Sequence, residues 1–330
     1  MTSPHPSSPG EDPGGAPVLA VDIGGTKTTA AVVTAGHRVT AAVTEPTPAE
    51  DGGPAVLATA LRLARQALAE AAAVPVAVGV GSAGVVDAAG RTVTAATSAL
   101  PGWAGTPVAD AFEGGFGVPA TVLGDVQAFL AGELAAGAAR GCGSAVAVMA
   151  GTGIGGAVAV GGAVVRGAHG AAGHLGHVGV GAAAGLVCPC GAAGHVEAVA
   201  SGPAMAVRAR GLLPDRSIAG LPDVSALARA GVAEARQVLF QGGAALGAAV
   251  AGVVSVLDPE VVVLGGGVLA SGPWFPQAVA DGVRAHTLPS LAGVRVSASS
   301  LGGAAVLVGA AAEARRPVTR HLAPSAGGRS

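Results

Sequence analysis

The sequence has few of the features that mark proteins of membranes, nucleic acids or the secretory route. Its 330 residues include 18 lysines and arginines and 20 aspartates and glutamates, which gives a formal net charge of -2. No block of like charge occurs, and a nucleic-acid surface or a polybasic membrane anchor needs one. We therefore expect neither a nucleic acid nor a membrane as partner, and predict a small molecule instead.

Long apolar runs are also scarce. Hydrophobic residues make up 51% of the chain and the mean hydropathy is +0.60, but 56 glycines interrupt the alanines and valines. We expect no segment to span a bilayer. The opening "MTSPHPSSPGEDPGGAP" lacks the basic and apolar regions of a signal peptide. We expect a disordered leader at 1–16, a disordered tail at 317–330 and a cytoplasmic location.

Only three cysteines occur, which makes a disulfide framework a poor expectation. Cys142 stands alone, whereas Cys188 and Cys190 form a C-x-C pair. An odd number with two so close together suits a metal site better. The pair lies in "AAGHLGHVGVGAAAGLVCPCGAAGHVEAVASG" (171–202), which also contains three histidines and one glutamate. These side chains are candidates for holding a metal, for chemistry and for selecting a substrate.

The alternation of apolar segments and glycines predicts an α/β protein. A chain of this length has room for two domains, each with its own core. The strand, glycine turn, strand pattern of 17–45 returns at 144–165, which indicates a second copy of one architecture. A long apolar helix at 235–257, a strand from 261 and a last helix at 302–316 follow.

Three glycine-rich loops each follow an apolar strand. They are "DIGGTKT" (22–28), "GTGIGG" (151–156) and "GGG" (265–267). Glycines let backbone N–H groups approach an anion closely, and the hydroxyls of Thr26 and Thr152 can add donors. One such loop would be read as a hairpin turn, but three at matching points of repeated halves favour phosphate binding. Neither a Walker loop nor a Rossmann fingerprint is present, so the phosphate site is of another kind.

Taken together, these motifs resemble the ROK family (repressors, open reading frames and sugar kinases) of the actin-like ATPase fold. The resemblance runs from about Val18 to Arg315. It is carried, in order, by "DIGGTKT", "GVGSAGVVD", "LPGW", "GDVQAFLAGE", "GTGIGGAV", "GHLGHVGV", "CPCGAAGHVEAVASG" and "LDPEVVVLGGGV". It implies a two-lobed, ribonuclease H-like fold with an interlobe cleft that closes over ATP, Mg²⁺ and a sugar. We expect an N-terminal lobe at 17–123, completed by a helix at about 304–316, and a C-terminal lobe at 124–303.

The resemblance assigns the phosphates to the first two glycine loops and the nucleoside to the third. The ATP-binding residues it implies are Asp22, Gly24, Gly25, Thr26, Lys27, Thr28, Gly151, Thr152, Gly153, Gly265, Gly266 and Gly267. Asp22 would face the phosphates and hold the magnesium shell. Its alternative role is to tie the following turn.

Phosphorylation of a sugar hydroxyl needs a carboxylate that accepts the hydroxyl proton. Asp125 lies where a strand becomes a helix in "VLGDVQAF" and matches the family's catalytic aspartate. Its alternative role is that of helix N-cap. The residues expected around the sugar are Gly84, Gly124, Asp125, His174, His177 and Glu197.

The family's metal motif places a histidine about ten residues before C-x-C-G and a further cysteine after it. His177, Cys188 and Cys190 match, but His195 stands where most members have that cysteine. Zinc accepts either donor in a tetrahedral site, so we expect a structural Cys₂His₂ zinc within a loop at 174–197. The alternative is that these four side chains bind no metal.

Departures from the family pattern gather in the sugar pocket. Most family kinases have Glu-x-Gly-His where this chain has "HLGH", so His174, which can donate a hydrogen bond, replaces a carboxylate that only accepts. A bacterial N-acetylmannosamine kinase subgroup has histidine there and glutamine two residues after the catalytic aspartate, as Gln127 is. Usual asparagines are replaced by Ala99 and Gly124, and Ala83 replaces a common proline. Drift in a disused pocket would explain the same changes.

We therefore predict an ATP-dependent kinase for the 6-hydroxyl of a hexose or N-acetylhexosamine, with N-acetylmannosamine favoured. Glucokinase is the alternative within this class, and a catalytically weak sugar sensor is another. The family also includes repressors with a helix-turn-helix domain ahead of the kinase-like fold. Only 21 residues precede Asp22, too few for that domain, so we expect no DNA binding. We also expect a homodimer.

Overall fold

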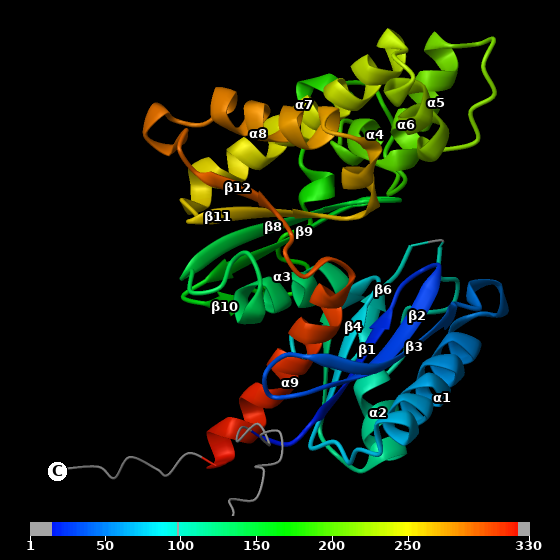
Figure 1. Cartoon of the computed structure of the whole chain (residues 1–330), viewed down its shortest axis with the longest axis vertical. Helices are drawn as coiled ribbons and strands as arrows, with labels where there is room; N and C mark the ends of the chain where they lie inside the picture. Colours follow the sequence, from blue (N-terminus) through cyan, green and yellow to red (C-terminus); the bar gives the residue numbers. More distant parts are fainter. Residues whose placement is uncertain (1–14, 98, 323–330) are drawn as a thin grey trace, which may run out of the picture.

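Two five-stranded sheets of the same topology organise the molecule. The computed structural model describes residues 15–97 and 99–322, with side chains described as far as residue 316. The strand orders are β3-β2-β1-β4-β7 and β10-β9-β8-β11-β12, and in each sheet two antiparallel pairings are followed by two parallel ones. The duplicated architecture predicted from the repeated glycine turns is therefore present, as two layered units joined near α3 and α9 (Figure 1).

The first sheet lies between helices on its two faces. Its strands are β1 (Val18–Ile23), β2 (Lys27–Val33), β3 (Val39–Pro46), β4 (Val78–Ser82) and β7 (Ala120–Gly124), with a small hairpin of β5 (Val85–Val86) and β6 (Val93–Ala95). Alternate residues of β1 face opposite sides, as the strand period requires. Leu19 and Val21 pack with α1 (Gly53–Ala71) and α2 (Val108–Phe116), whereas Val18 and Ala20 pack with α9 (Ala305–Leu322).

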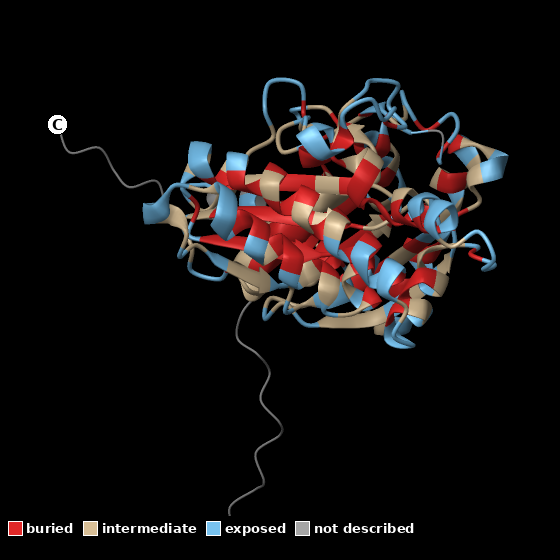
Figure 2. Ribbon diagram, turned by 90° about the horizontal axis from the view of Figure 1, so that it is seen from above, coloured by how far each residue is buried: buried red, intermediate tan, exposed pale blue. Residues whose placement is uncertain are grey.

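The second sheet is covered in the same way. Its strands are β8 (Ser144–Ala150), β9 (Ile154–Val160), β10 (Ala163–Val164), β11 (Val261–Gly265) and β12 (Arg295–Ala298). One face packs on a helical layer of α4 (Glu197–Ala200), α5 (Gly202–Leu212), α6 (Leu221–Arg229), α7 (Ala233–Leu257) and α8 (Trp274–His286). The other face packs on α3 (Asp125–Ala136) and the start of α9. Buried residues accordingly run through the sheets and the inner faces of the helices (Figure 2).

The helix α7 is long and apolar. By length and composition it is the one helix in the described part of the chain that could cross a membrane, and 61% of its most apolar window is buried inside the protein. Glycines bring α8 against it: a Cβ on Gly243 would lie 2.4 Å from the carbonyl oxygen of Phe275, and one on Gly247 would lie 2.5 Å from that of Val279. We therefore interpret α7 as the core helix of its lobe.

The helices α3 and α9 join the two lobes by backbone contact. A Cβ on Gly309 would lie 1.8 Å from the carbonyl oxygen of Ala128. The carboxylate of Glu133, which is 0% exposed, accepts hydrogen bonds from Ala138 N (2.6 Å), from Leu301 N (3.3 Å) and from the Ser299 hydroxyl. These bonds fix the segment between β12 and α9 to α3. The lobe boundaries at 17–123 and 124–303 remain a prediction, and the leader at 1–16 lies almost wholly outside the described residues. The disordered tail was expected at 317–330, but α9 continues to Leu322, and 323–330 lie outside the described residues.

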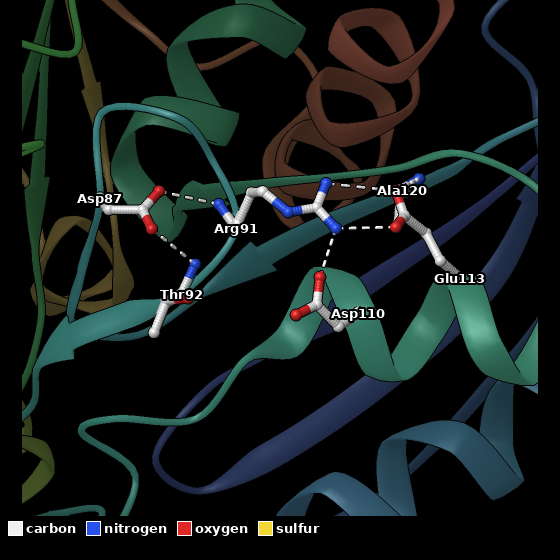
Figure 3. A network of polar contacts seen from close by, with 6 residues as sticks. All are labelled: Asp87, Arg91, Thr92, Asp110, Glu113 and Ala120. Atoms are coloured by element: carbon white, nitrogen blue, oxygen red, sulfur yellow. Dashed lines mark hydrogen bonds and ion pairs between the residues drawn. The ribbon is translucent and has the colours of Figure 1, made fainter.

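A polar network holds the β5–β6 hairpin against α2 and β7 (Figure 3). The Arg91 guanidinium donates to both Glu113 oxygens, with Nη1–Oε1 at 3.3 Å and Nη2–Oε2 at 2.7 Å, and also pairs with Asp110. Arg91 N donates to Asp87 Oδ1 at 2.9 Å, and Ala120 N at the start of β7 donates to Glu113 Oε1 at 3.2 Å. The network thereby fixes the hairpin that follows β4.

Candidate active site

Two carboxylates come together at one edge of the first sheet. The parallel strands β1, β4 and β7 end side by side, with Ile23 opposite Ser82 and Ser82 opposite Gly124. Asp22 is the penultimate residue of β1, and Asp125 directly follows β7. Ligands of open α/β sheets bind at the carboxyl ends of strands. The structure therefore brings the predicted base and the predicted phosphate-facing aspartate to one place.

Burial shapes the electrostatics of this pair. It raises the pKa of Asp22 to about 7. The negative charge of Asp125 contributes to this increase, and the Lys27 ammonium opposes it. Burial also raises the pKa of Asp125, partly offset by the hydrogen bond from Val126 N (2.8 Å) and by the positive charge of His174. Two interacting carboxylates that are withdrawn from water favour a bound proton or a cation. Carboxylate oxygens are also the donors that Mg²⁺ prefers, so the pair fits the expected metal.

The N-cap position of α3 belongs to Gly124 rather than to Asp125. Asp125 is the first helical residue, and its Oδ1 accepts the adjacent N–H of Val126 at 2.8 Å. Gly124 N donates instead to Gln127 Oε1 at 3.3 Å. The N-cap alternative for Asp125 is thus not what the structure shows.

Gln127 connects the start of α3 to a distant segment, a role that the sequence pattern did not reveal. It is 5% exposed, and its Nε2 donates to the carbonyl oxygen of Gly170 at 3.2 Å. Gly170 has φ 75°, and a Cβ there would lie 1.7 Å from Val86 O, so a side chain is excluded. The segment from Gly170 to His174 is consequently held beside Asp125.

His174 is exposed, and its ring orientation is fixed by one hydrogen bond. Nδ1 lies 3.0 Å from the carbonyl oxygen of Ala171. Because a carbonyl only accepts, Nδ1 carries the hydrogen and the neutral ring presents Nε2 as an acceptor. The ring also stacks on His177, with centroids 6.2 Å apart. The donor expected from the sequence is therefore available at Nε2 only when the ring is protonated.

The first glycine turn has an open side and a supported side. Gly24 N donates to Lys27 O at 3.0 Å and closes the turn, while the side chains of Thr26 and Lys27 are exposed. Thr28 is 0% exposed, and its hydroxyl lies 2.9 Å from that of Thr47, which donates to Gly24 O at 2.8 Å. Thr28 thus supports the turn from behind instead of facing an anion.

The loops beside this turn are packed closely. A Cβ on Gly25 would lie 3.6 Å from the Cβ of Ala99, so the "LPGW" loop reaches the first glycine turn. Trp103 of that loop is buried and donates to Ser82 Oγ at 3.0 Å. Gly84 has φ 100°, and its carbonyl oxygen lies 3.6 Å from a Cβ placed on Gly124, the residue before Asp125.

The second and third glycine loops meet in the other lobe. A Cβ on Gly266 would lie 2.3 Å from Ala150 O, and one on Gly265 would lie 2.6 Å from the Phe129 ring. These two glycines therefore serve close packing. In contrast, a Cβ on Gly151 or Gly267 would meet nothing within 4 Å, so their backbone is open to a ligand.

Glu197 lies beside the β8–β9 turn. Its Oε2 accepts from Ile154 N at 2.7 Å, behind the β8–β9 turn. A Cβ on Gly153 would lie 2.7 Å from the same oxygen. Its Oε1 lies 3.8 Å from Cys188 Sγ. Glu197 thus touches both the β8–β9 turn and the predicted metal loop.

The four predicted zinc ligands converge. The possible ligand atoms of His177, Cys188, Cys190 and His195 all lie within 4.8 Å of one another. The histidine Nδ1 atoms are 3.3 Å apart, Cys188 Sγ is 3.8 Å from His177 Nδ1, and Cys190 Sγ is 3.2 Å from His195 Nδ1. Zinc bonds of about 2.05 Å to nitrogen and about 2.3 Å to sulfur put neighbouring ligands of a tetrahedron about 3.3 to 3.8 Å apart. These three distances lie in or close to that range, so the four side chains can gather around one ion.

Burial affects metal binding by His177 and by Cys188 in opposite ways. Burial lowers the pKa of His177, which keeps its ring in the neutral form that ligates. Burial raises the pKa of the Cys188 thiol to about 11, so an ion must displace its proton. We therefore expect binding at this site to be coupled to proton release.

Comparison with known proteins gives a consistent picture. The chain is 34% identical over 299 residues to the bifunctional enzyme NanE/NanK of Brucella melitensis, covering 89% of this chain and 53%, about half, of that enzyme. It is 32% identical over 320 residues to the glucokinase of Streptomyces coelicolor, covering 91% of this chain and 98% of that protein.

A solved structure of similar fold is a ROK family glucokinase from Streptomyces griseus in complex with glucose and AMPPNP. The TM-score is 0.77 and the identity 31%, with 91% of this chain and 99% of that chain covered. The predicted α/β, actin-like ATPase fold is confirmed by this likeness. The sequence pattern of the ROK family matches residues 18–316, and the chain accordingly belongs to the ROK family.

Proposed function

We propose that this protein is an ATP-dependent sugar kinase that phosphorylates the 6-hydroxyl of a hexose or N-acetylhexosamine. The observation that carries the proposal is the position of Asp125, at the same sheet edge as Asp22 and beside the first glycine turn. Relatives named as kinases, and a similar structure that holds glucose and AMPPNP, support the reaction class.

In the proposed mechanism Asp125 accepts the proton of the sugar hydroxyl as that oxygen attacks the γ-phosphorus of ATP. Its raised pKa makes the ionised carboxylate a stronger base than an aspartate in water. Bound Mg²⁺ would neutralise charge on the phosphates, and Asp22 is the side chain that would hold it. ADP leaves as the phosphoryl group is transferred.

The open residues of the glycine loops are the proposed phosphate contacts. Thr26 and Lys27 are exposed on the first turn, Thr152 is exposed on the second, and Gly151 and Gly267 have open backbone. We assign Thr28, Gly265 and Gly266 to the support of these loops, because their hydroxyl or Cα is enclosed by protein atoms. Gly24, Gly25 and Gly153 supply the remaining backbone of the two turns.

We propose a structural zinc at His177, Cys188, Cys190 and His195, supported by the convergence of their ligand atoms, which all lie within 4.8 Å of one another. Four protein ligands leave no position for a reacting water. The ion would therefore order the loop at 174–197, from which His174 reaches the sugar side of the site.

N-acetylmannosamine is the proposed substrate and glucose the alternative. His174 and the buried Gln127 beside Asp125 favour the former. The similarity to a NanE/NanK enzyme and to a glucokinase is nearly equal, which keeps both within the proposal. The proposal also includes a homodimer in the cytoplasm, which light scattering and fractionation can test.

A coupled assay of ADP release over glucose, mannose and their N-acetylamino derivatives tests this function. We expect turnover with Mg²⁺ and ATP, highest for N-acetylmannosamine. Highest kcat/KM for glucose would make the protein a glucokinase. If the protein binds a sugar of the panel but phosphorylates none of them, it is a sugar sensor and not a kinase.

A further inference from the structure

After β10 the chain leaves the second sheet and returns to it a few residues later. Val165 N donates to Val158 O of β9 at 2.8 Å, so the chain is still tied to the second lobe at this point. A Cβ on Gly173 would lie 2.6 Å from the Cα of Ala157, which is also in β9. We call residues 166–172, between these two points, the interlobe loop.

The interlobe loop contacts the first lobe at two places. Arg166 Nη1 donates to Val122 O in β7 at 2.9 Å. Gly170 lies against β5, where its φ of 75° and a Cβ position 1.7 Å from Val86 O leave no room for a side chain. Ala172 N donates to Arg166 O at 3.1 Å and closes the loop on itself. The loop is therefore attached to the first lobe at its start and again near its end.

Arg166 completes the hydrogen bonding of a buried strand. β7 is the last strand of the first sheet, and Val122 in its middle is 0% exposed. Val122 N donates to Gly90 O at 3.0 Å, and Val122 O accepts from Arg166. A buried carbonyl that loses its partner destabilises the structure around it. The bond therefore holds the loop more firmly than a hydrogen bond exposed to water would.

The hairpin between β5 and β6 leaves space for this guanidinium. Gly90 has φ 72°, and a Cβ there would lie 2.6 Å from Arg166 Nη1 and 2.9 Å from Val122 O. The guanidinium thus occupies the space that a side chain at position 90 would need. Burial lowers the pKa of Arg166, and the charges of Glu313 in α9 and of Asp87 in the hairpin oppose that change. The hairpin is itself fixed by the polar network of Figure 3.

Both partners of this contact lead directly to the proposed sugar side of the site. Val122 precedes Asp125 by three residues, at the end of the same strand. The interlobe loop leads to His174, whose Nδ1 lies 3.0 Å from Ala171 O in the loop. The position of His174 relative to Asp125 therefore depends on how the loop is fastened to β7.

We propose that Arg166 is a positioning residue for sugar binding: it fastens the interlobe loop, and with it His174, to the first lobe beside Asp125. The inference rests on the proposed sugar kinase function and deepens it. Gln127 holds the same loop through Gly170 O, so the loop is fixed from β7 by one side chain and from α3 by the other.

Steady-state kinetics of the full-length protein test the effect on the sugar. Arg166→Met keeps most of the side-chain length and loses the donor. It should raise KM for the sugar that the parent prefers about tenfold and lower kcat by less than about threefold. The Kd for AMPPNP with Mg²⁺, measured by calorimetry, should stay within about twofold of the parent. An unchanged sugar KM, or an equal rise in the AMPPNP Kd, would overturn the inference.

Two further variants separate the hydrogen bond from the bulk of the side chain. Arg166→Lys can still donate to one carbonyl, so its sugar KM should lie between those of the parent and Arg166→Met. Arg208→Met, at an exposed position of α5, is the matched control and should change nothing. A sugar KM for Arg166→Lys as high as that for Arg166→Met would reject the hydrogen bond to β7 as the cause.

A double-mutant cycle with His174 distinguishes positioning from a general loss of stability. His174→Glu can change sugar selectivity only while residue 174 is held at the sugar. In the Arg166→Met background its effect on the ratio of kcat/KM values should shrink from about tenfold to about threefold or less. An undiminished effect would mean that His174 is placed without Arg166, which contradicts the proposal.

Amide exchange tests the fastening with no sugar present. In ligand-free Arg166→Met, exchange should become faster in a peptide that covers 166–174 and stay at the parent rate in β8. Unchanged exchange in that peptide would overturn the fastening, and faster exchange with an unchanged sugar KM would overturn its role in sugar binding. A parent protein that neither binds nor phosphorylates any sugar of the panel would reject the proposed function, whereas the exchange result would still decide the contact with β7.

Discussion

At the scale of single residues, the site depends on charges withdrawn from water. Burial raises the pKa of both Asp22 and Asp125. The two residues are far apart in the sequence and come together because β1, β4 and β7 end side by side. A raised pKa strengthens an ionised carboxylate as a base but costs folding free energy when no cation is bound. Substitutions separate these two consequences.

Asp125→Asn should lower kcat by at least about 100-fold, because the amide keeps the shape and cannot accept the proton. Calorimetric Kd values for ATP and for the sugar should remain close to those of the parent. Asp258→Asn is the control, since Asp258 is exposed with φ 46°, a conformation that asparagine also adopts. Turnover of Asp125→Asn within about threefold of the parent would remove Asp125 from the mechanism.

His174→Glu should shift the ratio of kcat/KM values from N-acetylmannosamine towards glucose by about tenfold, the size of one matched hydrogen bond. Because Nδ1 is held by Ala171 O, the ring can donate to the sugar only through Nε2 and only in its protonated form, whereas a carboxylate only accepts. Adding Asn at Ala99 and Gly124 should raise glucose activity further. His286→Glu, at the exposed end of α8, controls for the charge change. A ratio that does not move would favour drift of the pocket.

At the scale of elements, segments without regular structure are fixed by a few long-range contacts. The bond between Gln127 and Gly170 joins α3 to the segment before His174, and the four metal-site side chains join the two ends of its loop. Loss of one such contact should change one substrate's kinetics and leave the lobes folded.

Gln127→Glu should raise KM for the sugar about tenfold and leave the nucleotide Kd unchanged. A carboxylate oxygen would face the carbonyl of Gly170 and lose the hydrogen bond, worth about 1 kcal/mol or more. Steady-state kinetics with the sugar varied measure this, with Gln277→Glu at an exposed position as control. An unchanged KM would mean that this bridge does not place His174.

Cys190→Ser should remove one zinc per chain and lower the melting temperature together with sugar affinity, because a closed metal site contributes to folding free energy. Elemental analysis and a thermal melt check this. Cys142→Ser, a cysteine outside the site, should keep the zinc. An unchanged melting curve for Cys190→Ser would count against a metal at these ligands.

At the scale of the whole molecule, the paired sheets and the crossing of α3 with α9 decide how the two halves meet. Gly132, Gly309 and the buried Glu133 make that crossing a close backbone contact. The buried carboxylates at the sheet edge then lower the unfolding free energy of the ligand-free protein when they are ionised.

The unfolding free energy of the ligand-free protein should fall as pH rises from about 4 to about 7. In the folded state Asp22 has a pKa of about 7, above the unfolded value of 3.8. Its contribution to the unfolding free energy is therefore fully present below pH 3.8 and is lost as the pH rises through about 7. The slope should reach about 1.4 kcal/mol per pH unit, and Asp22→Asn should flatten it. Urea melts across this range measure it, with exposed Asp215→Asn as control. An equal slope in Asp22→Asn would contradict the buried charge.

The sequence by itself determined the family, the duplicated α/β fold and a set of four side chains that the structure brings together. Those inferences depend on local features, namely strand and turn patterns and short motifs in a fixed order, which are legible without tertiary contacts. The resemblance implied the roles of Asp125 and Asp22, but only the structure showed that their strands end side by side at one sheet edge. The length of α7 was legible too, but not its burial beneath α8.

Only the tertiary structure decided what each residue of a motif touches. Thr28 and Thr26 read alike in "DIGGTKT", yet Thr28 is enclosed by Thr47 and Thr26 is exposed. The contacts of Gln127 with Gly170 and of Glu197 with Ile154 each join residues 43 positions apart. Such pairings arise from the packing of whole elements, and a motif fixes the type of side chain but not the neighbour that packing supplies.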